Sequence, residues 1–151
     1  GKRVVQFDRR NNIMIDEAAV IEKFGVGPSS IIDYLALVGD TADGFPGLQG
    51  WGAKSASTVL AKYQLIDNIP DDHNQWIADG VTVRSAEKLA TTLRDNRKDA
   101  ALFKQLATLV TDVLVGDVGD WLWKGPTDRF EEVVNKLGAP HLTKRLSSII
   151  R

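Results

Sequence analysis

The stretch that most constrains the fold of this chain is a glycine-dense turn within residues 38–60, VGDTADGFPGLQGWGAKSASTVL. Apolar residues recur at helical spacing on both sides of the turn, which predicts two amphipathic helices joined by a short hairpin. The two apolar stripes are Ile31, Tyr34, Leu35 and Val38 before the turn, and Ala56, Val59, Leu60 and Tyr63 after it. Because glycines permit positive φ angles and let another backbone come close, the hairpin itself is suited to contact a second molecule.

The start of the second predicted helix has the composition of an anion site. Its first backbone N–H groups lack helical partners, and together with the helix dipole they favour a phosphate. Lys54 adds a charge and Ser55 a hydroxyl donor, while Leu48 and Trp51 would pack the hairpin into the core. Such contacts would go to the sugar-phosphate backbone of a nucleic acid and carry no sequence information. The predicted DNA-binding residues are Gly47, Gly50, Gly52, Lys54 and Ser55.

Two aspartates, Asp40 and Asp43, come just before this hairpin. They stand three residues apart at the end of the first helix, so their carboxylates can lie on one side of the chain. Hard oxygen ligands suit Mg²⁺ or Mn²⁺, which activate water and steady the leaving oxygen in two-metal phosphoryl chemistry. The spacing alone favours a plainer alternative, in which the two acids cap the turn in solvent. Two carboxylates are also too few for a pair of ions, so other ligands would have to come from elsewhere.

Composition is that of an ordinary domain of 151 residues, with 43% hydrophobic and 26% charged residues. The absence of cysteine excludes disulfides and thiolate metal sites. No apolar run approaches the ~20 residues of a membrane span, and the start lacks the apolar core of a signal peptide. We therefore expect a monomeric cytoplasmic protein. Since the net charge is −1, any nucleic-acid binding must be local.

The remaining segments predict a mainly α-helical chain with a short β-hairpin at its N-terminus. The hairpin uses strand-like runs around Val4–Phe7 and Ile13–Ile15. Residues 64–84 have the polar composition of a loop with a short helical turn, and Ser85 can cap the helix that follows. The apolar stripe of the next helix is predicted to be Leu102, Leu106, Leu109 and Val110.

Two further groups of residues leave alternatives open. A cluster of cations around two predicted helices could extend a DNA track or form a solvated helix face; it comprises Arg84, Lys88, Arg94, Arg97 and Lys98. Three tryptophans are expected to pack in the interior and not to stack on bases; these are Trp76, Trp121 and Trp123.

In its central stretch the chain resembles the flap-endonuclease-like 5′ nuclease family, which includes bacterial 5′→3′ exonucleases and the N-terminal nuclease domain of bacterial DNA polymerase I. The family pattern runs DYLAL-x-GD-x-x-DN-hydrophobic-PG-hydrophobic-x-GIG-x-KTA. This chain carries DYLAL at residues 33–37, followed by Gly39-Asp40, Asp43, Pro46-Gly47, Gly50-Trp51-Gly52 and Lys54-Ser55-Ala56. Three positions depart from the pattern: Gly44 stands for Asn, Trp51 for Ile and Ser55 for Thr.

The resemblance implies a helix-hairpin-helix part of an α/β 5′ nuclease fold. Residues 1–27 would be the end of the nuclease core, and residues 28–151 a helical DNA-binding subdomain. Asp40 and Asp43 would sit at the second metal position, and the hairpin would grip the duplex part of a nicked or 5′-flap DNA. A K⁺ ion could sit in the turn, held by the carbonyls of Leu48 and Trp51.

The resemblance also implies that other parts of the catalytic site lie outside this sequence. The family's remaining metal-binding acids, and the arch with its basic residues, are expected upstream of Gly1, so the other catalytic residues are unknown. We expect the chain alone to bind DNA weakly and not to cleave it efficiently.

A runner-up function is a non-catalytic helix-hairpin-helix module that positions a repair protein on DNA. Asp40 and Asp43 discriminate between the two functions, because acids beside bound phosphates would repel them unless a metal intervened. A third possibility, a protein-interaction domain, leaves the composition of the glycine turn unexplained.

Overall fold

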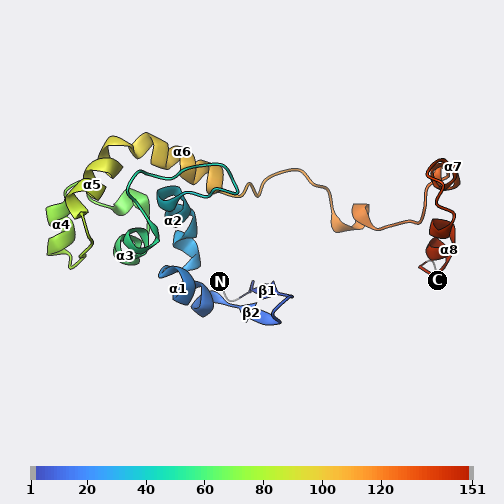
Figure 1. Cartoon of the computed structure of the whole chain (residues 1–151), viewed down its shortest axis with the longest axis horizontal. Coiled ribbons are helices and arrows are strands. Elements are labelled where there is room, and N and C mark those ends of the chain that lie inside the picture. Colours follow the sequence, from blue (N-terminus) through green and yellow to red (C-terminus); the bar gives the residue numbers. More distant parts are fainter. Residues whose placement is uncertain (1–2, 150–151) are drawn as a thin grey trace. The chain divides into compact units, whose positions relative to one another are not determined.

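The structure is a computed structural model that describes residues 3–149. It divides into two compact units between Val110 and Thr111. The predicted fold class is confirmed: the chain is mainly helical, with one antiparallel β-hairpin near its N-terminus (Figure 1). Within the described residues no helix is long and apolar enough to cross a membrane.

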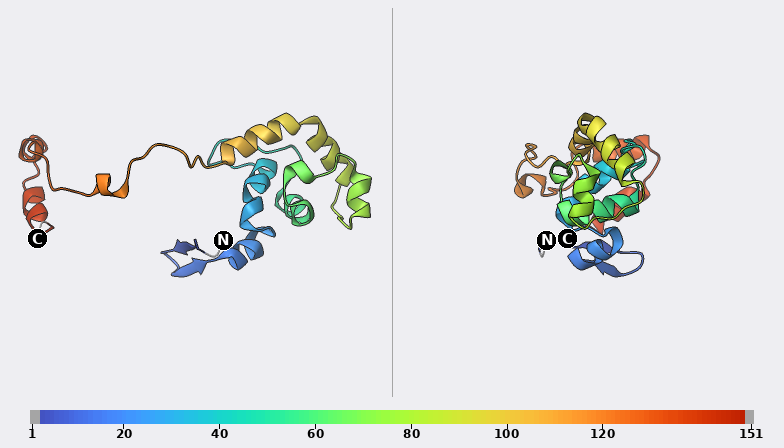
Figure 2. Two further views of the ribbon diagram at one scale, coloured as in Figure 1. Left: turned by 180° about the vertical axis from the view of Figure 1, so that it is seen from behind. Right: turned by 90° about the vertical axis from the view of Figure 1, so that its left-hand side faces the viewer.

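The first unit contains the hairpin and most of the helices. Its elements are β1 (Gln6–Asp8), β2 (Ile13–Ile15), α1 (Glu17–Phe24), η1 (Pro28–Ser30), α2 (Ile31–Val38), α3 (Ala53–Tyr63), η2 (Ile66–Asn68), α4 (His73–Ala78), α5 (Ala86–Asp95) and α6 (Arg97–Ala107). Gln6 of β1 pairs with Ile15 of β2, and the hairpin leads directly into α1 (Figure 2). The side chain of Asp16 accepts a hydrogen bond from Ala19 N and so starts α1, as expected of an N-cap acid.

The core of this unit forms where α2 packs against both α3 and α6. Apolar side chains from these helices are fully buried together with Trp76 of α4, which confirms the packing role predicted for that tryptophan. The N-terminal residues belong to the same unit, since Ser57 Oγ of α3 donates to Phe24 O of α1 at 2.5 Å. The predicted boundary between residues 27 and 28 stays a prediction of the family resemblance.

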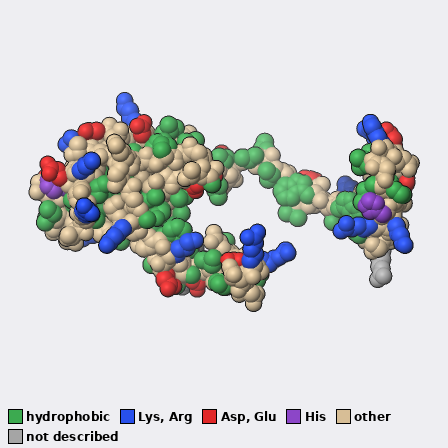
Figure 3. All heavy atoms as spheres, viewed as in Figure 1, with side chains coloured by type: hydrophobic (Ala, Val, Ile, Leu, Met, Phe, Trp, Pro, Cys, Tyr) green, Lys and Arg blue, Asp and Glu red, His purple; other side chains and the backbone are tan. Residues whose placement is uncertain are grey.

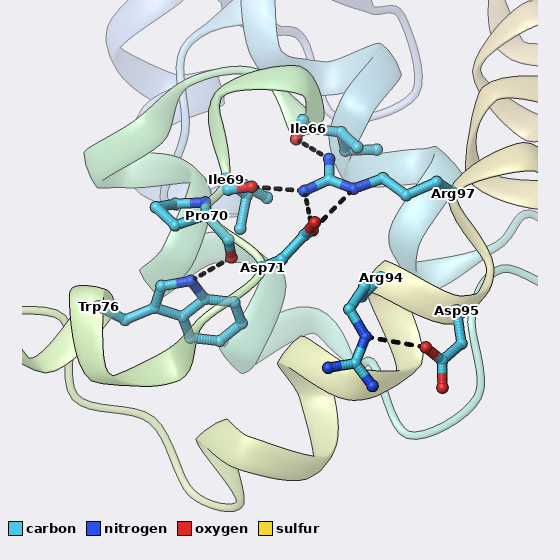
Figure 4. Close-up of polar contacts among 8 residues, drawn as sticks. All are labelled: Ile66, Ile69, Pro70, Asp71, Trp76, Arg94, Asp95 and Arg97. Carbon is cyan, nitrogen blue, oxygen red and sulfur yellow. Dashed lines mark hydrogen bonds and ion pairs between the residues drawn. The ribbon is translucent and has the colours of Figure 1, made fainter.

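Arg97 organises residues 64–84, which the sequence predicts to be a loop with a short helical turn and which contain the short helices η2 and α4. It donates hydrogen bonds to the carbonyl oxygens of Ile66, at 2.8 Å, and Ile69, and pairs with Asp71 at 2.7 Å (Figure 4). Figure 4 also shows Trp76 donating to the carbonyl of Pro70. These contacts hold η2 and α4 in fixed places within residues 64–84. Because the Arg97 guanidinium is used in them, Arg97 does not extend the DNA track that the cation cluster could form.

The apolar stripe predicted for α6 is wrong. Leu102 and Leu106 are 50% and 59% exposed, and Leu109 and Val110 lie beyond the end of the helix. The face turned to the core instead carries Ala100, Phe103 and Lys104, and Lys104 forms an ion pair with Asp33 of α2. Ala100 is fully buried, and the side chains of Phe103 and Lys104 are partly buried.

The second unit has little internal packing. It contains η3 (Val118–Trp121), α7 (Phe130–Lys136) and α8 (His141–Ser147). Trp121 and Trp123 are more than half exposed, so the packing role predicted for these two tryptophans is wrong. Figure 3 shows hydrophobic side chains exposed along the segment that precedes α7. Of the described residues in this unit, Val134 is the buried apolar one.

A buried ion pair ties α2 to α6. Asp33 of α2 has a side chain only 2% exposed, and its Oδ1 lies 2.8 Å from Lys104 Nζ. The same carboxylate accepts a hydrogen bond from Ile66 N at 2.9 Å, and Lys104 also contacts the exposed Asp67. Burial disfavours the charge on Lys104, but the hydrogen bonds to Asp33 and Asp67 outweigh it and raise the pKa of the amine. Lys104 is therefore held protonated against the one buried carboxylate described in the core.

We expect Lys104→Met to lower the free energy of unfolding by about 3 kcal/mol, because it leaves the Asp33 carboxylate buried without a cation. Asp67→Asn removes only an exposed partner of the same amine and should cost less than about 1 kcal/mol. Urea denaturation followed by circular dichroism measures both. Equal losses in the two variants would contradict a dominant role for the buried pair.

The stability that Lys104 contributes should decrease at high pH. Since the pKa of Lys104 is raised on folding, its contribution is complete below the unfolded pKa of about 10.4 and declines as the pH rises through the folded value. The stability difference between wild type and Lys104→Met should therefore shrink above about pH 10.5.

Candidate functional site

A crossing of two backbone segments, residues 37–39 and 46–48, closes the hairpin between α2 and α3. A Cβ on Gly39 would lie 2.5 Å from the carbonyl of Pro46, and a Cβ on Gly47 would collide with the backbone of residues 37–39. Both glycines also have positive φ angles, 88° and 70°. Only glycine satisfies both requirements, so the close crossing needs glycine at both positions.

Two large side chains seat the closed hairpin in the core. Leu48 N donates to Leu37 O at 2.9 Å, and the side chains of Leu48 and Trp51 are buried. The ring of Trp51 lies 6.0 Å from that of Trp76. This confirms the prediction that Leu48 and Trp51 pin the hairpin, and it holds the backbone of residues 49–52 in a fixed place at the surface.

The start of α3 leaves backbone donors available. Ser55 Oγ accepts from Gly52 N at 3.1 Å and donates to Gly52 O at 3.0 Å. Within the described part of the chain the N–H groups of Ala53, Lys54 and Ser55 have no partner. The hydroxyl of Ser55, predicted to donate to a phosphate, is thus already used to start the helix. Its backbone N–H remains as the donor at that position.

The local geometry does not require glycine at position 52. Its φ is −143°, an angle that every residue adopts, and a Cβ built there meets nothing within 4 Å. Glycine is accepted at a helix N-cap, but Ser, Asn and Asp are preferred there, so capping is only a weak reason for it. Gly50 differs, because its φ of 83° itself favours glycine. The space in front of Gly52 is therefore open to the backbone of another molecule.

A groove of about 710 Å³ opens in front of these glycines. We call it the α3–α5 groove, because the beginnings of both helices line it. Its lining consists of Gly50, Gly52, Ala53, Lys54, Ser55, Thr58, Val83, Arg84, Ser85, Lys88 and Leu89. Four of the five predicted DNA-binding residues thus meet in one groove, whereas Gly47 does not line it and lies in the backbone crossing.

The predicted cation cluster separates into residues inside and outside the groove. Arg84 and Lys88 line it, while Arg94 pairs with Asp95 at 3.0 Å and lines a different hollow. Lys98, on α6, is exposed and does not line the groove. The sequence contains a signal for this division, because basic-Ser-Ala occurs at the start of both lining helices, at residues 54–56 and 84–86.

The two predicted metal ligands lie on the other side of the backbone crossing. Asp40 and Phe45 exchange backbone hydrogen bonds of 3.0 and 3.1 Å, and the Phe45 ring stacks on Phe103 of α6 at 5.9 Å. Asp40 Oδ1 accepts from the backbone N–H of Ala42 at 2.9 Å and of Asp43 at 3.4 Å. Asp40 therefore orders its own turn, as the plainer alternative requires, and Asp43 is exposed beside it.

The described residues supply only some of the ligands that a bound metal ion needs. Among residues 3–149 no three acidic or histidine side chains form a group that could hold a metal. Asp40 and Asp43 are hard oxygen ligands of the kind that Mg²⁺ takes, but alone they do not complete a site. In the hairpin, Leu48 O accepts a hydrogen bond from Trp51 N at 3.1 Å, whereas Trp51 O has no described partner. Of the two carbonyls predicted for K⁺, that of Trp51 is the more available.

Most of the chain matches a known protein family and several bacterial proteins. Residues 26–129 match the family described as "5'-3' exonuclease, C-terminal SAM fold". The chain is 38% identical to DNA polymerase I of Pseudomonas aeruginosa over 123 residues, covering 76% of this chain and 12% of that protein. It is 34% identical to the 5'-3' exonuclease of Aquifex aeolicus over 114 residues, covering 75% of this chain and 35% of that protein.

A third relative matches a similar share of this chain. The 5'-3' exonuclease of Buchnera aphidicola is 32% identical over 107 residues, which cover 71% of this chain and 37% of that protein. The chain therefore spans little more than a third of these exonucleases and about an eighth of the polymerase.

The backbone crossing predicts a difference between two glycines of the same turn. Gly47→Ala should lower the free energy of unfolding by more than about 3 kcal/mol, because it adds a collision to the positive-φ cost of about 1–2 kcal/mol. Gly44→Ala is the matched control, since its φ is also positive but a Cβ there meets nothing within 4 Å. It should cost only about 1–2 kcal/mol in the same denaturation experiment. Equal costs would contradict the close crossing.

Proposed function

Because this chain belongs to the 5′–3′ exonuclease family, through that family's C-terminal SAM-fold domain, we propose that it is the DNA-gripping part of a structure-specific 5′→3′ nuclease. The α3–α5 groove holds the sugar-phosphate backbone of duplex DNA, near a nick or a 5′ flap. Gly50 and Gly52 let the strand approach, and the free N–H groups at the start of α3 donate to a phosphate. Lys54 supplies a positive charge beside them.

The observation that carries this proposal is the open space at Gly52. Neither its backbone angle nor its neighbours require glycine, and it stands in a groove that also contains unpartnered backbone donors. An approaching ligand backbone explains all three facts together. A plain tight turn explains the positive φ of Gly50 but leaves Gly52 unexplained.

We further propose that Asp40 and Asp43 supply two oxygen ligands to a divalent metal, Mg²⁺ or Mn²⁺. When bound, such an ion activates water for attack on a phosphodiester. Asp40 is preorganised for this task, because two backbone N–H groups orient its Oδ1 and the bridge to Phe45 fixes its main chain. The remaining ligands would come from outside this chain. A K⁺ ion in the hairpin would bind the carbonyl of Trp51, with that of Leu48 as a second ligand.

The runner-up is a binding module without catalysis, which would use the same groove. The two aspartates favour the nuclease, because the plainer turn-ordering role uses the Asp40 side chain and leaves the exposed Asp43 carboxylate without a described task. A binding module has no use for a second acid at this turn, whereas a divalent metal does. We expect the protein to act as a monomer in the cytoplasm.

Gly52→Ala tests the groove. The added methyl should weaken binding of a short DNA duplex about tenfold or more, because it fills the space where the strand approaches. Stability should change by less than about 1 kcal/mol, because the backbone angle suits alanine. Fluorescence anisotropy with a labelled duplex measures affinity, and thermal melting measures stability.

Gly27→Ala is the matched control for this experiment. Gly27 also has an ordinary backbone angle, a φ of −72°, and a Cβ there meets nothing within 4 Å, but it lies outside the groove. This variant should keep the wild-type affinity. Normal duplex binding by a folded Gly52→Ala protein would overturn the assignment of the groove.

Asp40→Asn tests the metal proposal in a protein of the relatives' full length that contains this chain. Loss of one ligand charge should slow cleavage of a 5′-flap substrate about 100-fold or more, while duplex affinity without metal is unchanged or slightly higher. A gel assay for cleavage and an anisotropy assay for binding separate the two effects. Full cleavage activity would remove Asp40 from the metal site and favour the plainer turn-capping role.

A further inference from the structure

The α3–α5 groove has a second wall that the proposed function leaves unused. That wall comes from the residues before α5 and from its first turn, and it brings Arg84, Ser85 and Lys88 to the same groove as Lys54. Arg84 and Lys54 are thirty residues apart in the sequence, so the fold and not the local pattern assembles this set.

Among the described residues, the cations of the groove have no acidic partner, unlike three cations of the neighbouring helices α5 and α6. Arg94, Arg97 and Lys104 each lie within 3.0 Å of a carboxylate oxygen. By contrast, none of the ion pairs described for residues 3–149 includes the three groove cations, and no acidic residue lines the groove. In a chain with 20 acidic residues and a net charge of −1, this is a local excess of positive charge. It favours an anionic occupant along the whole groove.

The backbone at the start of α5 adds to this field. Ser85 has a φ of 59°, unusual for a residue with a side chain, and its hydroxyl makes no capping bond. Ser85 occupies the N-cap position of α5, as predicted, but its hydroxyl does not cap, so the first N–H groups of α5 keep no side-chain partner. The acid in the first turn of α5, Glu87, lines a separate hollow with Asp71 and Arg94 and leaves the groove positive.

We infer that Arg84 and Lys88 contact the phosphates next along the strand from the phosphate held at the start of α3. The groove then grips one strand of the duplex from two sides, through Lys54 on α3 and through Arg84 and Lys88 at α5. This inference rests on the proposed function, because it takes the occupant of the groove to be the backbone of DNA. It assigns a binding role to two residues that the hairpin motif does not contain.

The salt dependence of duplex binding by the 151-residue chain tests the inference, because each phosphate contact contributes about 0.9 to the slope of log K against log salt. The probe is a short blunt DNA duplex, titrated at several KCl concentrations. Lys54→Ala should lower the magnitude of the slope by about 0.9, and Arg84→Ala/Lys88→Ala by about 1.8. Arg84→Gln/Lys88→Gln, which removes the charge but keeps a polar side chain, should give the same loss as the alanine pair.

Lys62→Ala/Lys98→Ala is the matched control. It removes two exposed lysines from α3 and α6 that lie outside the groove and pair with no described acid, so its slope should equal that of wild type. A wild-type slope in Arg84→Ala/Lys88→Ala, with a reduced slope in Lys54→Ala, would overturn this inference and leave the proposed function intact. Absence of duplex binding by the unaltered chain would overturn both.

Discussion

The structure depends on a backbone crossing that only glycine permits. Where Gly39 meets residues 46 and 47, the chain passes so close to itself that a single added carbon would collide with main-chain atoms. The crossing sends the turn of Asp40 and Asp43 to one side and the hairpin of Gly50 and Gly52 to the other. Because Leu48 and Trp51 bury themselves beneath the hairpin, both surfaces are fixed before any ligand arrives. Such preorganisation lets a site bind without ordering itself first.

Much of this arrangement could be predicted from the sequence, because the features involved are local. Glycine spacing and helical periodicity indicate the two helices and the hairpin, and the first-turn Lys54 and Ser55 indicate the anion site. The prediction fails where a tertiary contact decides. The leucines of α6 have the period of a buried stripe, yet the helix turns Lys104 inward because Asp33 is buried on α2. No periodicity argument finds a buried charge as the anchor of a helix.

The cations show the same limit. A basic cluster is visible in the sequence, and the repeated basic-Ser-Ala pattern points to Arg84, but it does not show what the other members contact. Arg97 donates to the carbonyl oxygens of Ile66 and Ile69, whereas Arg84 has no described partner and lines the groove with Gly52. The fold separates the cations that stabilise the protein from those that face the groove. The incomplete metal set is a limit of another kind, since two aspartates within one turn cannot indicate where further ligands lie.

The central claim is that duplex DNA lies in the α3–α5 groove, and amide NMR tests it most directly. Titrating the labelled 151-residue chain with a short duplex should shift the backbone N–H signals of Ala53, Lys54 and Ser55, which are unpartnered in the structure, together with those of residues 84–86. The signals of residues 97–107 in α6 should stay in place. Shifts concentrated on α6, with the start of α3 unaffected, would contradict the account.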